Sequence, residues 1–180
     1  QPRYALVALG LPEGTEESFV DSMFDGLAEL AKEHRTSIVG GNITSSPTLT
    51  ITVTAVGDIA GPSMIRGGGR PGDLLVVTGP IGSAALGLQL MKEGREPTND
   101  DEKELLAAHF DPTPRVAAGQ ALRLMASAGL DISDGLVQDA GHLCQESRCG
   151  AIIKLDSLPL SPSYEQLTQS LEDPWAPALA

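Results

Sequence analysis

The chain has 180 residues, of which 41% are hydrophobic, so it can bury a core and intrinsic disorder is not expected. Twelve basic residues against 24 acidic ones give a net charge of −12, which repels the phosphates of a nucleic acid over the surface as a whole. No apolar stretch approaches the roughly 20 residues that cross a bilayer. We therefore expect no nucleic-acid partner and no membrane span.

The first 60 residues predict a strand, a helix and two more strands. Residues 4–11 form a continuous apolar run, as in a buried strand. Thr15 is expected to cap a helix that ends near His34, and its apolar stripe comprises Phe19, Met23, Leu27, Leu30 and Ala31. Residues 37–41 predict a short strand. Residues 48–59 alternate apolar side chains with threonines, which predicts a strand with one dry face.

The segment 61–72 differs in composition from its surroundings. It holds five glycines, two prolines, two arginines and no carboxylate, which is typical of a connector between folding units. We predict a first domain over 1–61, a linker over 62–72 and a second domain over 73–180. The second domain is expected to combine short strands with helices. The strands are 73–78, 130–133 and 151–155, and the helices are 83–93, 99–109, 115–128, 136–148 and 163–171.

The strongest chemical signal is the turn Asp131-Ile-Ser133-Asp134-Gly135 ahead of a helix. Carboxylates three residues apart can converge at such a turn, and Mg²⁺ favours carboxylate and phosphate oxygens. The helix start adds free backbone N–H groups that attract a phosphate. A phosphate bridged to Asp131 and Asp134 by metal fits this pattern. A plain helix cap by Ser133 or Asp134 is the alternative.

Two further segments are weaker candidates. The glycines before Asn42 allow a ligand to approach the backbone, and its amide oxygen can bind a cation, although an ordinary turn fits equally well. Arg66 and Arg70, with no carboxylate nearby, can pair with phosphate oxygens, although a solvated linker is the alternative.

The cysteine content predicts a cytoplasmic protein. Cys144 and Cys149 are too few for a disulfide scaffold and lack the spacing of a metal site. The chain opens with Gln1 and becomes strand-like by Tyr4, which suggests a piece of a longer protein.

Five segments together resemble the thiamine-monophosphate kinase family, within the superfamily of aminoimidazole ribonucleotide synthetase and selenophosphate synthetase. They are VGGNITSSP (39–47), the strand after it, IRGGGRPGDLLVVTGPIGSAALGL (65–88), HFDPTPR (109–115) and DISDGLVQDAGHL (131–143). The similarity covers nearly the whole chain, and its two long segments are fairly specific.

The resemblance implies an α+β or α/β fold of the two-domain aminoimidazole ribonucleotide synthetase type. The chain would hold the rear part of the N-terminal domain and most of the C-terminal domain. The implied enzyme uses ATP and Mg²⁺ to phosphorylate thiamine monophosphate to thiamine diphosphate. It would be a homodimer whose N-terminal domains pair into a β-barrel.

The resemblance also implies roles for particular residues. Asp131 and Asp134 match metal ligands, Ser133 matches an ATP contact, and Arg66 matches an arginine that contacts the nucleotide phosphates. Asn42 stands where many relatives have a metal-binding aspartate, and its amide oxygen could still coordinate. The family's Gly-Asp-Asp and Gly-Gly-Glu-Asp-Tyr segments are not in this sequence. We therefore expect an internal or C-terminal fragment that is inactive alone.

Three other interpretations stay open on the sequence. The chain could belong to another ATP-using member of the superfamily, such as an aminoimidazole ribonucleotide or selenophosphate synthetase. It could be a non-catalytic remnant that binds nucleotide or dimerises. It could also be an α/β domain whose acidic turn only caps a helix.

Overall fold

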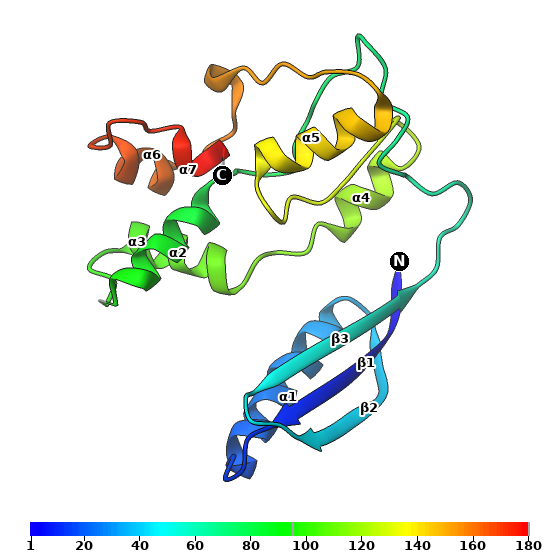
Figure 1. Ribbon diagram of the computed structural model, residues 1–180, viewed down its shortest axis with the longest axis vertical. Coiled ribbons are helices and arrows are strands. Elements are labelled where there is room, and N and C mark those ends of the chain that lie inside the picture. The colour runs from blue at the N-terminus through cyan, green and yellow to red at the C-terminus, as the bar shows by residue number, and fades with distance from the viewer. Residues whose placement is uncertain (95, 180) are drawn as a thin grey trace. The chain divides into compact units, whose positions relative to one another are not determined.

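The computed structural model describes residues 1–94 and 96–179, which divide into two units (Figure 1). The first unit spans residues 1–62 and the second spans residues 63–180.

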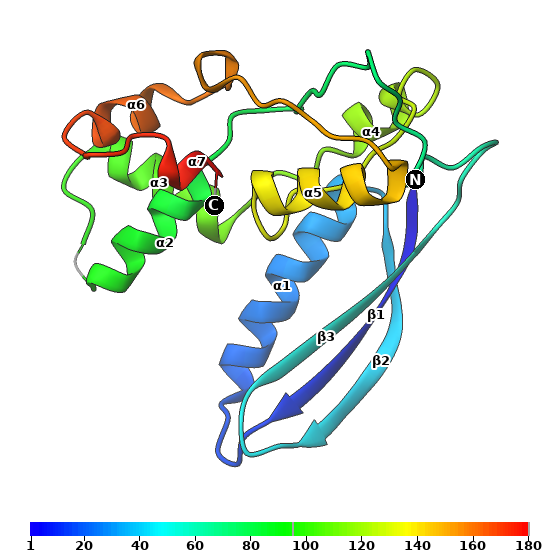
Figure 2. The same ribbon diagram turned by 45° about the horizontal axis from the view of Figure 1, so that its top comes forward.

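The first unit is a three-stranded sheet with one helix. Its elements are β1 (Pro2–Leu11), α1 (Glu17–Glu33), β2 (Ser37–Ser45) and β3 (Thr50–Gly57). The strand order is β2-β1-β3, with β1 parallel to β2 and antiparallel to β3. Parallel neighbours need a crossover connection, which α1 supplies, and α1 lies along one face of the sheet (Figure 2). All four elements are therefore confirmed.

The central strand carries the buried side of this unit. Alternate residues Ala5, Val7 and Leu9 are buried, as the two-residue period of a strand requires. On α1 the side chains around Met23 and Leu27 are half-buried, whereas Phe19 and Leu30 are exposed, so the predicted stripe is wrong at those two positions. The predicted Thr15 cap is also wrong. Glu16 is the N-cap residue, and the Thr15 hydroxyl instead donates to the Pro12 carbonyl at 2.7 Å.

The predicted dry face of β3 is exposed in this structure. Ile51 and Val53 pair in register with the buried Leu9 and Val7, yet they are 46% and 51% exposed. The reason is that β3 is an edge strand and α1 contacts β2, at the opposite edge of the sheet. The alternation of the sequence marks which side chains share a face, but not whether that face is covered.

The second unit is helical and closes around one apolar cluster. Its helices are α2 (Ser83–Glu93), α3 (Asp100–Phe110), α4 (Val116–Leu122), α5 (Leu136–Ser147), α6 (Pro162–Thr168) and α7 (Ala176–Leu179), with a 3-10 turn at Leu155–Ser157. The buried cluster comprises Ile81, Leu86, Leu90, Leu105, Leu136, Tyr164 and Ala178. Ile81 lies just before α2 and the others lie on α2, α3, α5, α6 and α7, so the cluster joins most of the unit.

Close packing of α2 explains two of its glycines. A Cβ at Gly87 would overlap the Leu105 carbonyl, so only glycine lets α2 and α3 approach this closely. Gly82, the N-cap of α2, has φ of 82° and faces Tyr164 and Ala178. The start of α2 is therefore packed closely against α6 and α7.

The three strands predicted in the second unit are wrong. In the described part of the chain, residues 73–78, 130–133 and 151–155 hold no strand, and none of them forms a ladder with another segment; Leu155 begins the 3-10 turn. A strand exists only through its paired backbone groups, and apolar composition alone does not supply a partner. Val77 and Ile153 nevertheless pack against the buried cluster. The helix predicted over 115–128 is shorter and gives way to a turn after Leu122.

Among the described residues, no helix is long and apolar enough to cross a membrane.

The buried tyrosine predicts a loss of stability at alkaline pH. Tyr164 is fully buried and its hydroxyl donates to the Pro174 carbonyl at 2.7 Å. Burial raises the pKa of Tyr164 above its usual value of about 10. A raised pKa in the folded state contributes stability that is complete below pH 10 and lost as pH rises through the folded pKa. We expect the urea midpoint, followed by Trp175 fluorescence, to fall above pH 10.

Tyr164→Phe removes both effects. It should cost about 1 kcal/mol at neutral pH through the lost hydrogen bond, and its midpoint should fall less above pH 10 than that of the wild type. Tyr4→Phe, at the exposed tyrosine of the first unit, is the matched control and should follow the wild type. Parallel curves for Tyr164→Phe and wild type would contradict this prediction.

Candidate functional site

The acidic turn lies directly before α5. Asp131, Ser133 and Asp134 are exposed, and Gly135 is the N-cap residue with φ of 123°. Only glycine adopts such a backbone without strain. Within the described residues no side chain caps α5, so the interpretation of Ser133 or Asp134 as its cap is wrong. The carboxylates of Asp131 and Asp134 thus face solvent on a turn that the glycine makes sharp.

A third carboxylate, which the sequence did not single out, holds this turn from inside. Asp139, in the first turn of α5, is buried with 4% of its surface exposed. Its Oδ2 accepts hydrogen bonds from the backbone N–H groups of Ser133 at 2.8 Å and Asp134 at 3.1 Å. These two N–H groups, which precede the helix, are therefore taken by the protein itself and are not free to bind a phosphate.

The electrostatics of Asp139 follow from these contacts. Burial alone raises the pKa of Asp139, because it removes water from the charged form. The backbone N–H groups of residues 133 to 135, and His142 nearby, lower it by more, so the pKa of Asp139 lies below its usual value. Asp139 is therefore a buried anion at neutral pH.

The turn and α5 together gather three possible metal ligands. One ligand atom each from Asp134, Asp139 and His142 lies within 4.8 Å of the others. Asp131 does not belong to this group. Asp134 also accepts a hydrogen bond from the Gln138 amide at 3.2 Å. Oxygen donors on an exposed turn, with no lysine or arginine paired to them in the described chain, suit a hard cation such as Mg²⁺.

The glycine-rich segment holds the opposite end of α5. The N–H of Gly69 donates to the Ser147 hydroxyl at 3.0 Å, and the N–H of Gly129 donates to the Ile65 carbonyl at 3.0 Å. At Gly68, with φ of 135°, a Cβ would press on the Ser127 carbonyl. This part of the predicted linker is thus fastened to the second unit.

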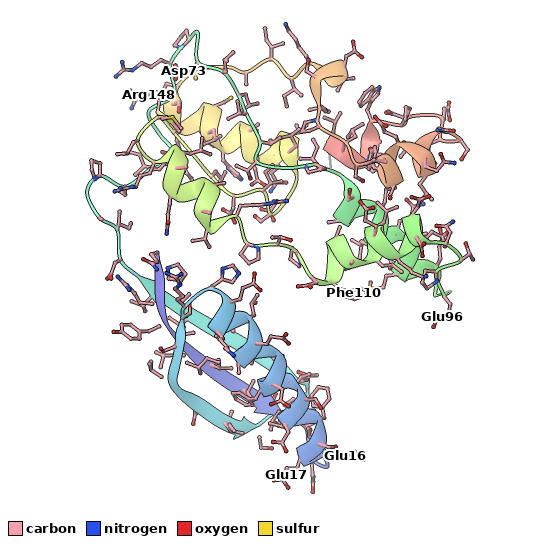
Figure 3. The ribbon with its side chains drawn as sticks, turned by 180° about the vertical axis from the view of Figure 1, so that it is seen from behind. Glu16, Glu17, Asp73, Glu96, Phe110 and Arg148 are labelled. Atoms are coloured by element: carbon pink, nitrogen blue, oxygen red, sulfur yellow. The ribbon has the colours of Figure 1, made fainter. Side chains whose placement is uncertain are left out.

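Asp73 closes the same segment. Its Oδ2 accepts from the Ser127 hydroxyl at 2.5 Å and from the Arg70 N–H at 2.9 Å, and chiefly the serine lowers the pKa of Asp73. Figure 3 labels Asp73 together with Arg148, the residue that ends α5. The segment is therefore tied to both Ser127 and α5.

The structure places four of the predicted site residues at the two ends of α5 in the second unit and one on a strand of the first unit. Asp131, Ser133 and Asp134 lie at the start of α5, and Arg66 lies beside its end, because the Ser147 hydroxyl donates to the Arg66 carbonyl at 3.4 Å. A helix of 12 residues is about 18 Å long, so Arg66 is not adjacent to the turn. Asn42 is exposed on β2 of the first unit, in register with Ala8. The ligand roles of all five stay predictions.

Sequence reasoning singled out neither Asp139 nor His142 as a possible ligand. The available signal was a carboxylate in the first turn of a helix that begins with glycine, three residues before a histidine. Whether such a carboxylate accepts hydrogen bonds from the N–H groups before the helix depends on burial of its side chain, and a single sequence does not show which side chains are buried.

A cavity of about 420 Å³ lies elsewhere in the second unit, between α2, α3 and α6. Its walls include Leu86, Leu90 and Leu167, and none of the predicted site residues lines it. It therefore does not serve the acidic turn.

Comparison with known families decides the relationship. Residues 1–59 match the N-terminal domain of AIR synthase related protein, and residues 70–177 match its C-terminal domain. The chain belongs to the AIR synthase related protein family. The fold expected from the sequence motifs is thereby confirmed.

The resemblance to thiamine-monophosphate kinases is confirmed as well. The chain is 39% identical to the enzyme of Salmonella typhimurium over 162 residues, which are 89% of the chain and 49% of that protein. It is 37% identical to the enzyme of Aquifex aeolicus, over 89% of the chain and 52% of that protein. This AIR synthase related chain spans about half the length of the curated relatives it matches.

Solved structures show the same relationship. AaThiL complexed with AMPPCP and TMP matches 99% of the chain with a TM-score of 0.92 and 34% identity, over 58% of that structure. Thiamine-monophosphate kinase from Stenotrophomonas maltophilia matches 99% of the chain with a TM-score of 0.91 and 35% identity, over 57% of its own chain.

The packing of the glycine-rich segment predicts a local effect of Gly68→Ala. An alanine there adopts a strained φ and pushes on the Ser127 carbonyl, at a cost of about 1–3 kcal/mol to the closed segment. Trypsin should then cleave after Arg66 about 5- to 100-fold faster, because cleavage needs the segment to open. Gly141→Ala in α5, where nothing lies within 4 Å of the new Cβ, is the control. Equal cleavage rates in the two variants would show that the segment is already loose.

Proposed function

We propose that this chain forms part of a kinase that transfers the γ-phosphate of ATP to thiamine monophosphate, giving thiamine diphosphate and ADP. The observation that carries the proposal is its similarity, over 99% of its length, to AaThiL complexed with AMPPCP and TMP. The exposed carboxylates before α5 supply the chemistry that such a reaction needs.

Magnesium fits the residues at the acidic turn. Asp131 and Asp134 would hold it through carboxylate oxygens. Asn42 of the first unit stays a separate candidate, whose amide oxygen can bind a cation. When bound, Mg²⁺ masks the charge of the phosphates and draws electron density from the transferring group. Ser133 would contact ATP beside these ligands.

The negative charge of the chain opposes the binding of anionic substrates, so Mg²⁺ and Arg66 would have to offset it. A net charge of −12 repels both ATP and thiamine monophosphate, and the turn adds the buried charge of Asp139. Arg66 would counter this repulsion at the other end of α5. Its distance from the turn favours a contact with the part of the nucleotide that lies away from the metal-bound phosphate.

We propose direct in-line attack of the substrate phosphate on the γ-phosphate. Phosphoryl transfer depends mainly on positioning and charge neutralisation, so the protein needs no nucleophile of its own. A phosphorylated protein intermediate trapped during turnover of the intact gene product would contradict this route.

The partners and location follow from the same proposal. The substrates are ATP and thiamine monophosphate, and two first units would pair across a homodimer. We place the reaction in the cytoplasm, where the free thiols of Cys144 and Cys149 stay reduced. The 180-residue chain alone is expected to lack turnover.

Neutralising either exposed aspartate should weaken nucleotide binding. Asp131→Asn and Asp134→Asn each remove a charge-assisted metal contact, which should cost roughly 1–3 kcal/mol, or about 5- to 150-fold in affinity. Calorimetric titration with AMPPCP in the presence of Mg²⁺ measures the change. Glu146→Gln, an exposed carboxylate on α5, is the control and should leave affinity unchanged. Wild-type affinity in both aspartate variants would remove the basis of the proposal.

Substrate choice separates this proposal from other members of the superfamily. Purified intact gene product should release ADP when thiamine monophosphate is added, and not with aminoimidazole ribonucleotide precursors. Release that does not depend on thiamine monophosphate would reject the proposed substrate, while leaving nucleotide binding in place.

A further inference from the structure

We propose that Asp139 is a positioning residue: its buried carboxylate holds the turn of residues 131–135 in the shape that presents Asp131 and Asp134 to a metal. This inference rests on the proposed function, because it concerns the same metal site. It assigns Asp139 a role in shaping the site and no direct contact with the metal.

The geometry favours an inward role for Asp139. A single oxygen, Oδ2, receives the N–H groups of two successive residues, Ser133 and Asp134. Two convergent hydrogen bonds fix the peptide planes of both residues, and burial of the carboxylate prevents water from replacing them. Asp134 itself is exposed, so the bonds hold its backbone while its side chain stays accessible to solvent.

Anchoring also fixes Asp139 itself. Its own N–H donates to the Gly135 carbonyl at 2.9 Å, so the residue that accepts from the turn is also bonded to the residue that ends the turn. The next residue of α5, Ala140, is buried, and so is Leu136 of the central cluster. The turn is thus bonded to a part of α5 that the core holds in place.

The same contacts select what the turn can bind. The N–H groups of Ser133 and Asp134 are no longer free to bind a phosphate, and a buried negative charge lies behind them. A phosphate alone therefore finds neither of these N–H donors free, whereas the exposed carboxylates of Asp131 and Asp134 attract a divalent cation. We infer that a phosphate reaches this turn only together with its metal ion.

Four variants of the chain separate positioning from ligation. Asp139→Asn keeps an oxygen that can accept both N–H groups but removes the charge. Asp139→Glu keeps the charge but moves the oxygens, and Asp139→Ala removes both. Leu106→Ala, a half-buried residue packed on the central cluster, is the control for a general loss of stability. Binding of Mn²⁺ with AMPPCP is measured by electron paramagnetic resonance, below the melting temperature of each variant.

Positioning predicts a particular order of affinities. Asp139→Asn should bind within about threefold of the wild type, whereas Asp139→Glu and Asp139→Ala should lose about 10- to 100-fold, as for residues that orient metal ligands. Leu106→Ala should melt earlier and bind normally. If Asp139→Ala does not fold, the comparison of the asparagine and glutamate variants carries the same test.

Other orders overturn the inference. Loss in Asp139→Asn with retention in Asp139→Glu would make Asp139 a metal ligand, and wild-type binding in all three variants would leave it no role in the site. Both results leave the proposed function intact, since the wild type binds. If the wild-type chain shows no nucleotide-dependent Mn²⁺ binding, the proposed function fails and this inference fails with it.

Discussion

A buried carboxylate that accepts backbone N–H groups is the contact on which the candidate site depends. Burial of Asp139 costs free energy because its carboxylate loses water. Hydrogen bonds from the N–H groups of the turn offset this cost and help to keep the pKa of Asp139 below its usual value. The same bonds fix a turn of exposed carboxylates ahead of α5. Buried Asp139 thus holds in place the turn that carries the exposed carboxylates of Asp131 and Asp134. The proposed function depends on these two exposed carboxylates.

Helix α5 connects the parts of the second unit that the proposal uses. Its start carries the acidic turn, and its end receives the glycine-rich segment through Ser147. Leu136 packs it into the central cluster between these ends. A single rigid element therefore sets the separation of the negative turn from the positively charged segment with Arg66. In a chain with a net charge of −12, this separation keeps Arg66 from pairing with the carboxylates that are expected to bind metal.

The sequence was sufficient for every element with a strong local pattern. The strand 4–11 was predicted from its continuous apolar run and the helix with Met23 and Leu27 from its helical spacing, because such signals reside in neighbouring residues. It failed where partners decide the outcome. Within the described residues, 73–78 and 151–155 have strand-like side chains but pair with no other strand, and the apolar face of β3 stays exposed.

The local motifs of the candidate site were predicted from the sequence, but the contacts between distant or buried groups were not. The two carboxylates before a helix were visible as a motif, and so was the glycine-rich segment with Arg66. Asp139 was not visible, because its part depends on burial and on which N–H groups it meets. The distance between Arg66 and the turn also required the structure, since it is set by the length and packing of α5.

The central claim is that the turn of residues 131–135 binds a divalent cation together with a nucleoside triphosphate. Paramagnetic broadening of backbone amide signals by Mn²⁺, with AMPPCP present, tests it most directly. The account predicts saturable broadening that is strongest from Asp131 to Leu136 and that requires the nucleotide. Broadening centred on the acidic start of α3, at residues 100–104, or broadening that is the same without nucleotide, would contradict it.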